Sequence, residues 1–457
     1  MKLALPLLII LLTITKIGNS QEKDKHYSFQ DLAEKALLHA ENEHYLKAAV
    51  ELEKLNPNDS MYNSMLTSAA YYYLLAEDNE KCVEICNKGI KSSHFSSPYF
   101  FYINKIAALS KLEKNEEAVQ VASEAIKRYP KSYTLYFNRA ISYEEIGEIK
   151  KAAKDLEESI QINPYHIKSH LRLGNLCAQQ NQTAQALMCL NIYLMLSPDE
   201  EYSSKILNLA NIIASRREPY TVDKKVSITQ NDADFEELNL ILNNKIGLNK
   251  KYKTRNKIRS SFAIQSHVLL QQLKEYEAKD GFWNEKYVPF FKWISERNFY
   301  NNMVYTTHFD SEYYKYKAIA KKNTTSVKNF VPQIYSKWSD IVARNPFKTN
   351  GKEVVKYSLY EELRLIGVGE LKDEKLHGSW TFYTKEGATA SSGSFDYGKK
   401  TGDWKIFSEN GEIEKELSYN NDELSGLFTT YKYGVMKHQS IYTEGKANGL
   451  ITNYYPN

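Results

Sequence analysis

Three stretches of the chain repeat one pattern every 34 residues: YINKIAALSKLEKNEEAVQVASEAIKRYP (Tyr102–Pro130), YFNRAISYEEIGEIKKAAKDLEESIQINP (Tyr136–Pro164) and HLRLGNLCAQQNQTAQALMCLNIYLMLSP (His170–Pro198). Each stretch begins with a large ring and ends in proline, and alanines recur in phase at Ala118, Ala152 and Ala186. Two short amphipathic helices cannot bury their apolar faces alone, so neighbouring repeats must stack, and proline stops each second helix. The period therefore predicts an α-solenoid of helix pairs.

This pattern resembles the tetratricopeptide repeat, in which a ring, a small residue, a tyrosine, an alanine and a terminal proline recur. Tyr143 occupies the tyrosine position, whereas Leu109 and Cys177 depart from it. Two weaker units precede the three strong ones, so we expect about five helix pairs over residues 27–215.

Arrays of this kind bind peptides on the concave face of their first helices, and the resemblance implies the same here. In members that bind chaperone tails, cations and amides clamp the C-terminal carboxylate of the peptide. Ile103 and Ala107 stand where that clamp has Lys and Asn, so part of it is absent. A solvated polar helix face is the alternative. The candidate peptide-binding residues in this register are Asn138, Lys168, Arg172 and Asn175.

The middle of the chain, residues 216–350, is predicted to be a basic helical region. Residues 216–360 hold 26 basic against 15 acidic side chains, and none is acidic between Glu237 and Glu275. Such a cluster predicts an anionic surface or polyanion as ligand, with a solvated loop as the alternative. The candidate residues for this site are Lys250, Lys251, Lys253, Arg255, Lys257 and Arg259.

Aromatic residues crowd the segment that follows. Aromatic surfaces can stack on sugars or peptides, but a spacing of three to four residues is more typical of a helix face in a core. We expect the core role. The residues concerned are Phe282, Trp283, Tyr287, Phe290, Phe291 and Trp293.

A second repeat occupies residues 360–457, with a period of 23 to 24. Sequences such as DWKIFS alternate every two residues and predict strands. Gly387 and Gly411 suit the positive φ of tight hairpin turns. The repeated glycines are Gly378, Gly402, Gly426 and Gly449, each followed two residues later by a large apolar side chain.

These units resemble the MORN repeat and its bacterial variant in YwqK-type, antitoxin-like proteins. Lys399 and Lys446 fill the lysine of the Gly–Lys pair, which the first and third units lack. The resemblance implies a β-hairpin repeat sheet that serves as a structural or interaction module. The predicted fold class is thus α+β multidomain: a tetratricopeptide-type α-solenoid, a helical middle region and a C-terminal β-hairpin repeat sheet.

The first residues have the character of a signal peptide. Met1 and Lys2 precede an apolar run of 12 residues, and Gly18, Asn19 and Ser20 offer a cleavage point. Twelve residues span roughly 18 Å as a helix, short of a bilayer core of about 30 Å. We therefore expect export, to the periplasm, the outer-membrane region or the medium, after cleavage near Ser20.

No catalytic constellation stands out in the sequence, and we predict no cofactor and no metal. His166 and His170 are four apart, but no third ligand is evident. Cys177 and Cys189 are interpreted as buried side chains, with a disulfide as the open alternative. GSFDYGKK (Gly393–Lys400) has P-loop spacing but lacks the final Ser or Thr and the helix that would hold phosphate.

The leading hypothesis is therefore an exported, non-enzymatic scaffold that binds a protein or peptide through its helical array. Its β-repeat tail would supply a second interaction surface. One alternative is an envelope glycan- or lipid-binding protein. Another is an enzyme with an atypical site in the middle region. A net charge of only +4, together with export, disfavours nucleic acid as a partner, and we expect no nucleotide.

Overall fold

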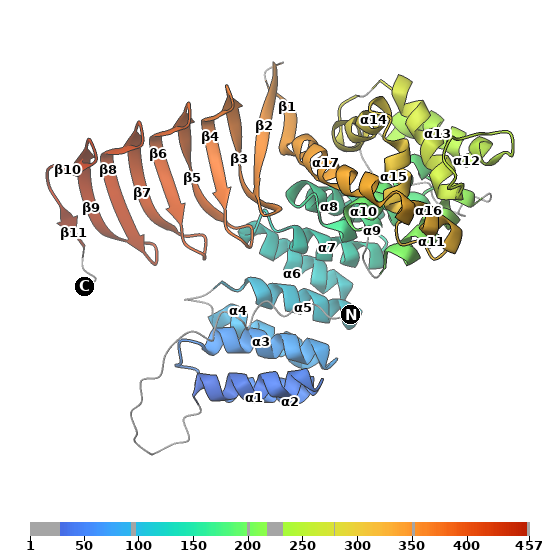
Figure 1. The fold of residues 1–457 in the computed structure, drawn as a ribbon. Coiled ribbons are helices and arrows are strands. Elements are labelled where there is room, and N and C mark those ends of the chain that lie inside the picture. The colour runs from blue at the N-terminus through green and yellow to red at the C-terminus, as the bar shows by residue number, and fades with distance from the viewer. Residues whose placement is uncertain are drawn as a thin grey trace. The chain divides into compact units, whose positions relative to one another are not determined.

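The computed structural model describes residues 28–92, 97–198, 202–216, 232–277, 279–349 and 352–454, so the predicted signal segment lies outside the described residues. The chain divides into two compact units, Met1–Ile85 and Cys86–Asn457. It is an α+β multidomain protein, in which helices precede an antiparallel sheet (Figure 1). Among the described helices, none combines the length and the apolar character needed to cross a membrane.

The smaller unit consists of short amphipathic helices. Its first helix begins at Ser28, whose Oγ accepts a hydrogen bond from the backbone N–H of Asp31 at 3.1 Å. Leu32, Ala49 and Leu66 supply fully or almost fully buried apolar side chains to its interior. The elements are α1 (Phe29–Glu41), α2 (Tyr45–Leu52), α3 (Tyr62–Leu75) and the first half of α4 (Asn79–Ser92).

The larger unit continues with the strong repeats. Helices α6, α8 and α10 each end two residues before the proline of their repeat. The phased alanines Ala118, Ala152 and Ala186 are all fully buried, which confirms the predicted stacking of helix pairs. The elements are α5 (Tyr99–Lys111), α6 (Asn115–Arg128), α7 (Tyr133–Glu145), α8 (Ile149–Ile162), α9 (Ile167–Gln179), α10 (Thr183–Leu196) and α11 (Ser203–Ser215).

The middle region packs against the end of the array. All 14 residues of α10 are buried, and one hydrophobic core includes Leu190 of α10 together with Phe290 and Trp338 of the middle helices. The region therefore closes the last repeat. Its elements are η2 (Asp232–Phe235), α12 (Glu236–Asn243), η3 (Ile246–Leu248), α13 (Ser261–Glu275), the π-helical η4 (Trp283–Tyr287), α14 (Val288–Glu296), α15 (Tyr300–Thr307), α16 (Tyr314–Lys322) and α17 (Thr324–Ala343).

In the described part of the chain, eleven strands form one antiparallel sheet in sequence order, except that β11 pairs with β9. It begins at Arg344, before the predicted boundary at residue 360, because β1 and β2 form a hairpin without the glycine–aromatic pattern. The strands are β1 (Arg344–Thr349), β2 (Lys352–Glu361), β3 (Arg364–Lys372), β4 (Lys375–Tyr383), β5 (Thr389–Asp396), β6 (Lys399–Phe407), β7 (Ile413–Asn420), β8 (Glu423–Lys432), β9 (Val435–Thr443), β10 (Lys446–Ala447) and β11 (Thr452–Asn453).

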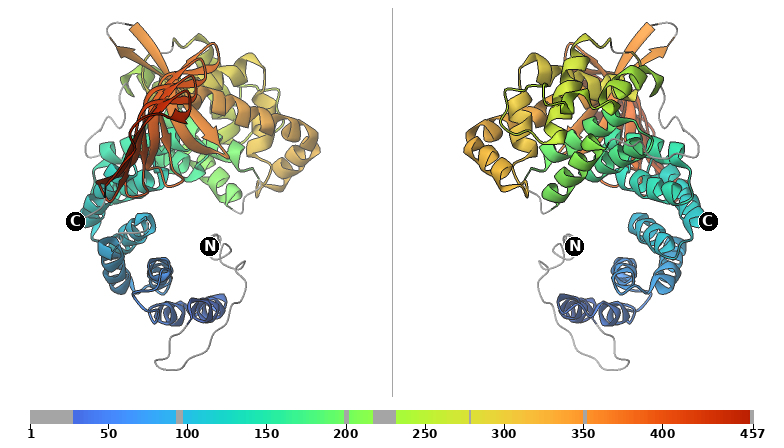
Figure 2. Two further views of the ribbon diagram at one scale, coloured as in Figure 1. Left: turned by 90° about the vertical axis from the view of Figure 1, so that its left-hand side faces the viewer. Right: turned by 90° about the vertical axis from the view of Figure 1, so that its right-hand side faces the viewer.

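The sheet is a single layer that covers its own apolar residues. No described helix lies over β6–β9 in Figure 1, and Figure 2 shows the strands fanning out with the sheet's twist. Trp380 and Trp404 are nearly buried because each ring lies against a glycine of the preceding strand. A Cβ added at Gly369 or Gly393 would come within 2.2 Å of the ring opposite. The repeat thus builds a ladder of rings along one face.

The hairpin turns contact the array, and Gly387 provides a test of that contact. Its φ is +88°, its carbonyl accepts the backbone N–H of Lys131 at 2.9 Å, and an added Cβ would lie 2.2 Å from the Lys131 carbonyl carbon. Gly411 has a φ of +79° with open space around it. We expect Gly387→Ala to destabilise the larger unit by about 3 kcal/mol, against about 1 kcal/mol for Gly411→Ala, which carries only the backbone strain.

Urea unfolding and hydrogen exchange at the Lys131 amide would measure this difference. Equal effects of the two substitutions would contradict the contact between the turn and the array.

Candidate functional site

The first candidate site is the face of the first helices α7 and α9. Helix α7 begins at Ser132, whose Oγ accepts a hydrogen bond from the Leu135 backbone N–H at 3.4 Å, and it buries Leu135 and Ala140 against its neighbours. Asn138 is half-buried on this helix. Its side chain makes no hydrogen bond within the described part of the chain, so its amide is open to a ligand.

Helix α9 carries the other three predicted residues at i, i+4 and i+7, a spacing that places them on one helix face. Lys168 is exposed, and Arg172 and Asn175 are half-buried. Neither Lys168 nor Asn175 has a hydrogen-bonding or ion-pair partner among the described residues. The two predicted cations, Lys168 and Arg172, therefore lie on the same face of a single helix.

Arg172 is joined to the neighbouring first helix by an ion pair that the sequence analysis missed. Its Nε donates to Oε1 of Glu144 at 2.8 Å, with the two side chains 32% and 18% exposed. Burial raises the pKa of the Glu144 carboxyl, and the Arg172 guanidinium opposes that shift. The sequence held only a weak sign of this partner, namely that Glu144 and Glu145 are the only acidic residues of α7. A carboxylate thus already occupies one side of the predicted clamp.

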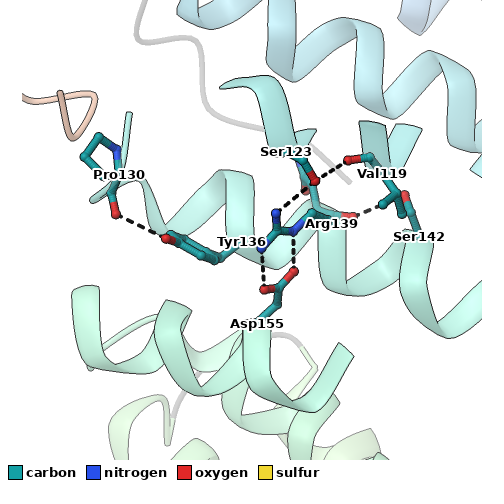
Figure 3. A network of polar contacts seen from close by, with 8 residues as sticks. Val119, Ser123, Pro130, Tyr136, Arg139, Ser142 and Asp155 are labelled. Atoms are coloured by element: carbon teal, nitrogen blue, oxygen red, sulfur yellow. Dashed lines mark hydrogen bonds and ion pairs between the residues drawn. The ribbon is translucent and has the colours of Figure 1, made fainter. Parts of the chain in front are cut away.

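A second ion pair lies deeper between the helix pairs (Figure 3). Arg139 of α7 donates from Nε and Nη2 to the two oxygens of Asp155 on α8, at 2.7 and 2.8 Å, and from Nη1 to Ser123 Oγ of α6 at 2.9 Å. Its guanidinium also lies over the rings of Tyr136 and Tyr143. One side chain therefore connects three helices, and this role is structural.

The second candidate site, named here the cationic loop, is the connection Lys250–Arg259 between η3 and α13. All six predicted cations are exposed, and none forms an ion pair within the described residues. From residue 252 onward exposure alternates: Lys253, Arg255, Lys257 and Arg259 face solvent, and the residues between them are half-buried or buried. The structure thus brings the whole predicted cluster together.

Contacts with the helices behind it fix the base of the loop. Asn256 is buried and donates from Nδ2 to Oδ1 of Asn301 at 2.9 Å, and Ile258 is fully buried. The hydroxyl of Tyr252 lies 2.6 Å from Nδ1 of His267. The loop therefore holds its cations on a fixed framework.

The aromatic segment of the middle region forms no surface platform. Trp283, Tyr287, Phe290 and Phe291 are buried in the core shared with the last repeats, and Phe282 and Trp293 are half-buried against it. The core role expected from their spacing is confirmed, so these rings supply no site for sugar stacking.

Three titratable groups in the same shared core, those of His170, Cys189 and Tyr287, are also buried. Nδ1 of His170 lies 2.6 Å from the Tyr287 hydroxyl, and the Cys189 thiol lies 3.5 Å from the same oxygen. Burial lowers the pKa of His170 to about 4 and raises that of Cys189. These shifts keep the groups neutral inside the core, where they serve packing.

Two further predictions concern sulfur and metals. All four cysteines are buried thiols, so Cys177 and Cys189 are not joined by a disulfide. Within the described ranges, no three His, Cys, Asp or Glu side chains gather closely enough to hold a metal ion.

Comparison with known proteins finds relatives for the helical part. No family model matches the chain. It is 34% identical over 91 residues to human WD and tetratricopeptide repeats protein 1, a match covering 19% of this chain and 13% of that protein. It is 41% identical over 64 residues to Hsp70-Hsp90 organizing protein 3 of Arabidopsis thaliana, covering 14% and 12%. The matches thus span about an eighth of each relative's length.

Solved structures similar to the chain include a MamA fragment from Desulfovibrio magneticus RS-1, with 14% identity, a TM-score of 0.33 and coverage of 38% of this chain and 96% of that one. YrrB, described as a TPR protein with an unusual peptide-binding site, has 16% identity and a TM-score of 0.31 over 39% and 90%. The sequence match to a tetratricopeptide-repeat protein, together with the stacked helix pairs, shows that the N-terminal helical repeats resemble a tetratricopeptide-repeat solenoid.

Proposed function

We propose that this protein is an interaction scaffold whose first-helix face, on α7 and α9, binds the carboxylate-bearing end of a peptide or protein partner. The observation that carries the proposal is the Arg172–Glu144 ion pair, in which a carboxylate already contacts Arg172. A partner's carboxylate would take the place of Glu144 and gain Lys168 and Asn138 as further donors. Similarity to Hsp70-Hsp90 organizing proteins supports a protein-binding role.

The remaining parts of the proposal concern the tail and the location of the protein. The sheet resembles MORN-type repeats in sequence and would present a second interaction surface. Leu427 and Ile441 support this, because they are paired across β8 and β9 and are each 48% exposed. The basic and apolar start of the sequence supports export.

Binding of an acidic fluorescent peptide with a free C-terminal carboxylate tests the clamp. Fluorescence anisotropy should show that Lys168→Ala with Arg172→Ala weakens binding about tenfold, since charge-assisted hydrogen bonds are lost. Glu144→Gln should strengthen binding, because it frees Arg172 from its internal partner. Amidation of the peptide should weaken binding to the unaltered protein.

The matched control is Lys47→Ala with Lys150→Ala, which removes two exposed lysines elsewhere. The clamp would be refuted if binding is unchanged both when the peptide is amidated and when Lys168→Ala is combined with Arg172→Ala.

A further inference from the structure

The cationic loop carries charge that no ion pair within the described ranges neutralises. Its six exposed cations form no ion pair among the described residues, and the sequence has no acidic residue between Glu237 and Glu275. Concentrating like charges on one short loop costs free energy through mutual repulsion. An anionic surface would relieve that repulsion, so the loop is complementary to a negatively charged partner.

The loop is compact. An Nη2 of Arg259 donates to the backbone carbonyl of Tyr252 at 2.8 Å. Seven extended residues would span roughly 23 Å, well beyond the reach of one side chain, so the chain between them curls back on itself. In Figure 1 the connection between α12 and α13 projects from the helices at the right of the drawing. The six exposed cations therefore lie on a projecting connection.

Two exposed apolar side chains precede these cations in the sequence. Leu240 on α12 is 65% exposed and Ile246 on η3 is 60% exposed. Aliphatic side chains beside a polybasic segment are the combination that binds at a lipid interface, where the cations meet headgroups and the apolar side chains enter the acyl boundary.

The same geometry argues against other anions. Single-stranded nucleic acids and sugars are usually gripped by exposed aromatic rings. Tyr252, the only ring of the loop, is half-buried, with its hydroxyl against His267. The exposed side of the loop thus offers charge without a stacking platform.

We propose that the cationic loop, together with Leu240 and Ile246, docks the protein on an anionic lipid surface. The base held by Asn256 and Ile258 keeps the cations in place, so little chain entropy is lost on docking. Each cation near such a surface strengthens binding by roughly fivefold. This site is separate from the first-helix face, and the two can succeed or fail independently.

Co-sedimentation of the full chain with vesicles tests the proposal. The protein should pellet with equimolar phosphatidylcholine and phosphatidylglycerol at low salt, should remain in solution with phosphatidylcholine alone, and should dissociate as salt is raised. Combined Lys253→Glu, Arg255→Glu and Lys257→Glu should weaken binding on the order of 100-fold. Leu240→Ser with Ile246→Ser should weaken it several-fold and make the remainder more sensitive to salt.

Two controls keep the test specific. Combined Lys47→Glu, Lys150→Glu and Lys415→Glu changes net charge equally at exposed lysines elsewhere and should leave most binding intact. Lys168→Ala with Arg172→Ala should also bind vesicles normally. The proposal is overturned if the unaltered protein does not bind anionic vesicles or binds neutral vesicles equally well. It is also overturned if the triple control variant loses as much vesicle affinity as the triple loop variant.

Discussion

Replacing Trp338 by alanine should destabilise the larger unit by about 4 kcal/mol, the usual cost of truncating a fully buried tryptophan. Trp338 lies on α17, and its Nε1 donates to the Pro164 carbonyl in the α8–α9 connection at 2.7 Å. Its ring packs against His170 of α9 and against Tyr287 and Phe290 of the middle region. Removing it opens a cavity where the middle helices meet the array, and α17 loses its main anchor.

Urea denaturation combined with hydrogen exchange would measure the effect, with the largest gain in exchange expected in α17 and α9. Trp338→Phe is the matched control. It keeps a ring in the cavity, and Nε2 of His170, 3.0 Å from the Pro164 carbonyl, still provides that oxygen with a partner. We expect Trp338→Phe to cost about 1.5 kcal/mol. An alanine variant as stable as the phenylalanine variant would contradict the proposed anchor.

The contact made by Trp338 bears on function because the last repeat of a helical array needs another element to cover its apolar surface. Solenoid repeats bury their faces against neighbours, and a terminal repeat exposes apolar surface unless another element covers it. Here α10 is mostly apolar and completely buried. The middle region supplies this cover. It also carries the cationic loop, which lies between η3 and α13, and both α12 and α13 pack into the shared core.

The helical array could be predicted from sequence because each repeat is locally complete. The phase of Ala118, Ala152 and Ala186 fixes which side chains face the neighbouring helix, and all three are buried. The prolines Pro130 and Pro164 fix where each second helix ends. The rings and glycines of the sheet were equally regular, and Gly387 and Gly411 have the positive φ that hairpin turns require.

Contacts between distant parts of the chain could not be predicted, because no local pattern encodes them. Trp338 and Pro164 are 174 residues apart in sequence and meet in the core. Strand β1 contains no repeat glycine and fell inside the predicted helical region, whereas β2 lies mostly between that region and the predicted repeats.

The two candidate sites also differ in how far their residues are separated in sequence. The cationic loop is contiguous in sequence, so charge counting alone located it. The first-helix face joins α7 to α9 across 28 residues, and the register that located Arg172 gave no sign that Glu144 would be its partner.

The second large effect is expected at Asp155, the buried partner of Arg139. Asp155→Ala should destabilise the larger unit by about 3 kcal/mol, because it leaves the Arg139 guanidinium largely desolvated and without its carboxylate. The two side chains are only 16% and 6% exposed. Burial raises the pKa of Asp155, while the guanidinium opposes that shift. Desolvation of the two groups therefore offsets part of the stabilisation that the ion pair supplies.

That balance predicts a non-additive result. Arg139→Met combined with Asp155→Leu removes both charges and fills the space with apolar atoms, so the double variant should be within about 1 kcal/mol of the original stability. Each single variant should be much less stable than the double. Urea unfolding of all four proteins closes the cycle. If the double variant loses the sum of the two single losses, Arg139 and Asp155 are not energetically coupled and the argument from burial is wrong. If it recovers, the pair serves to fix how α6, α7 and α8 align, and with them the face that carries Asn138.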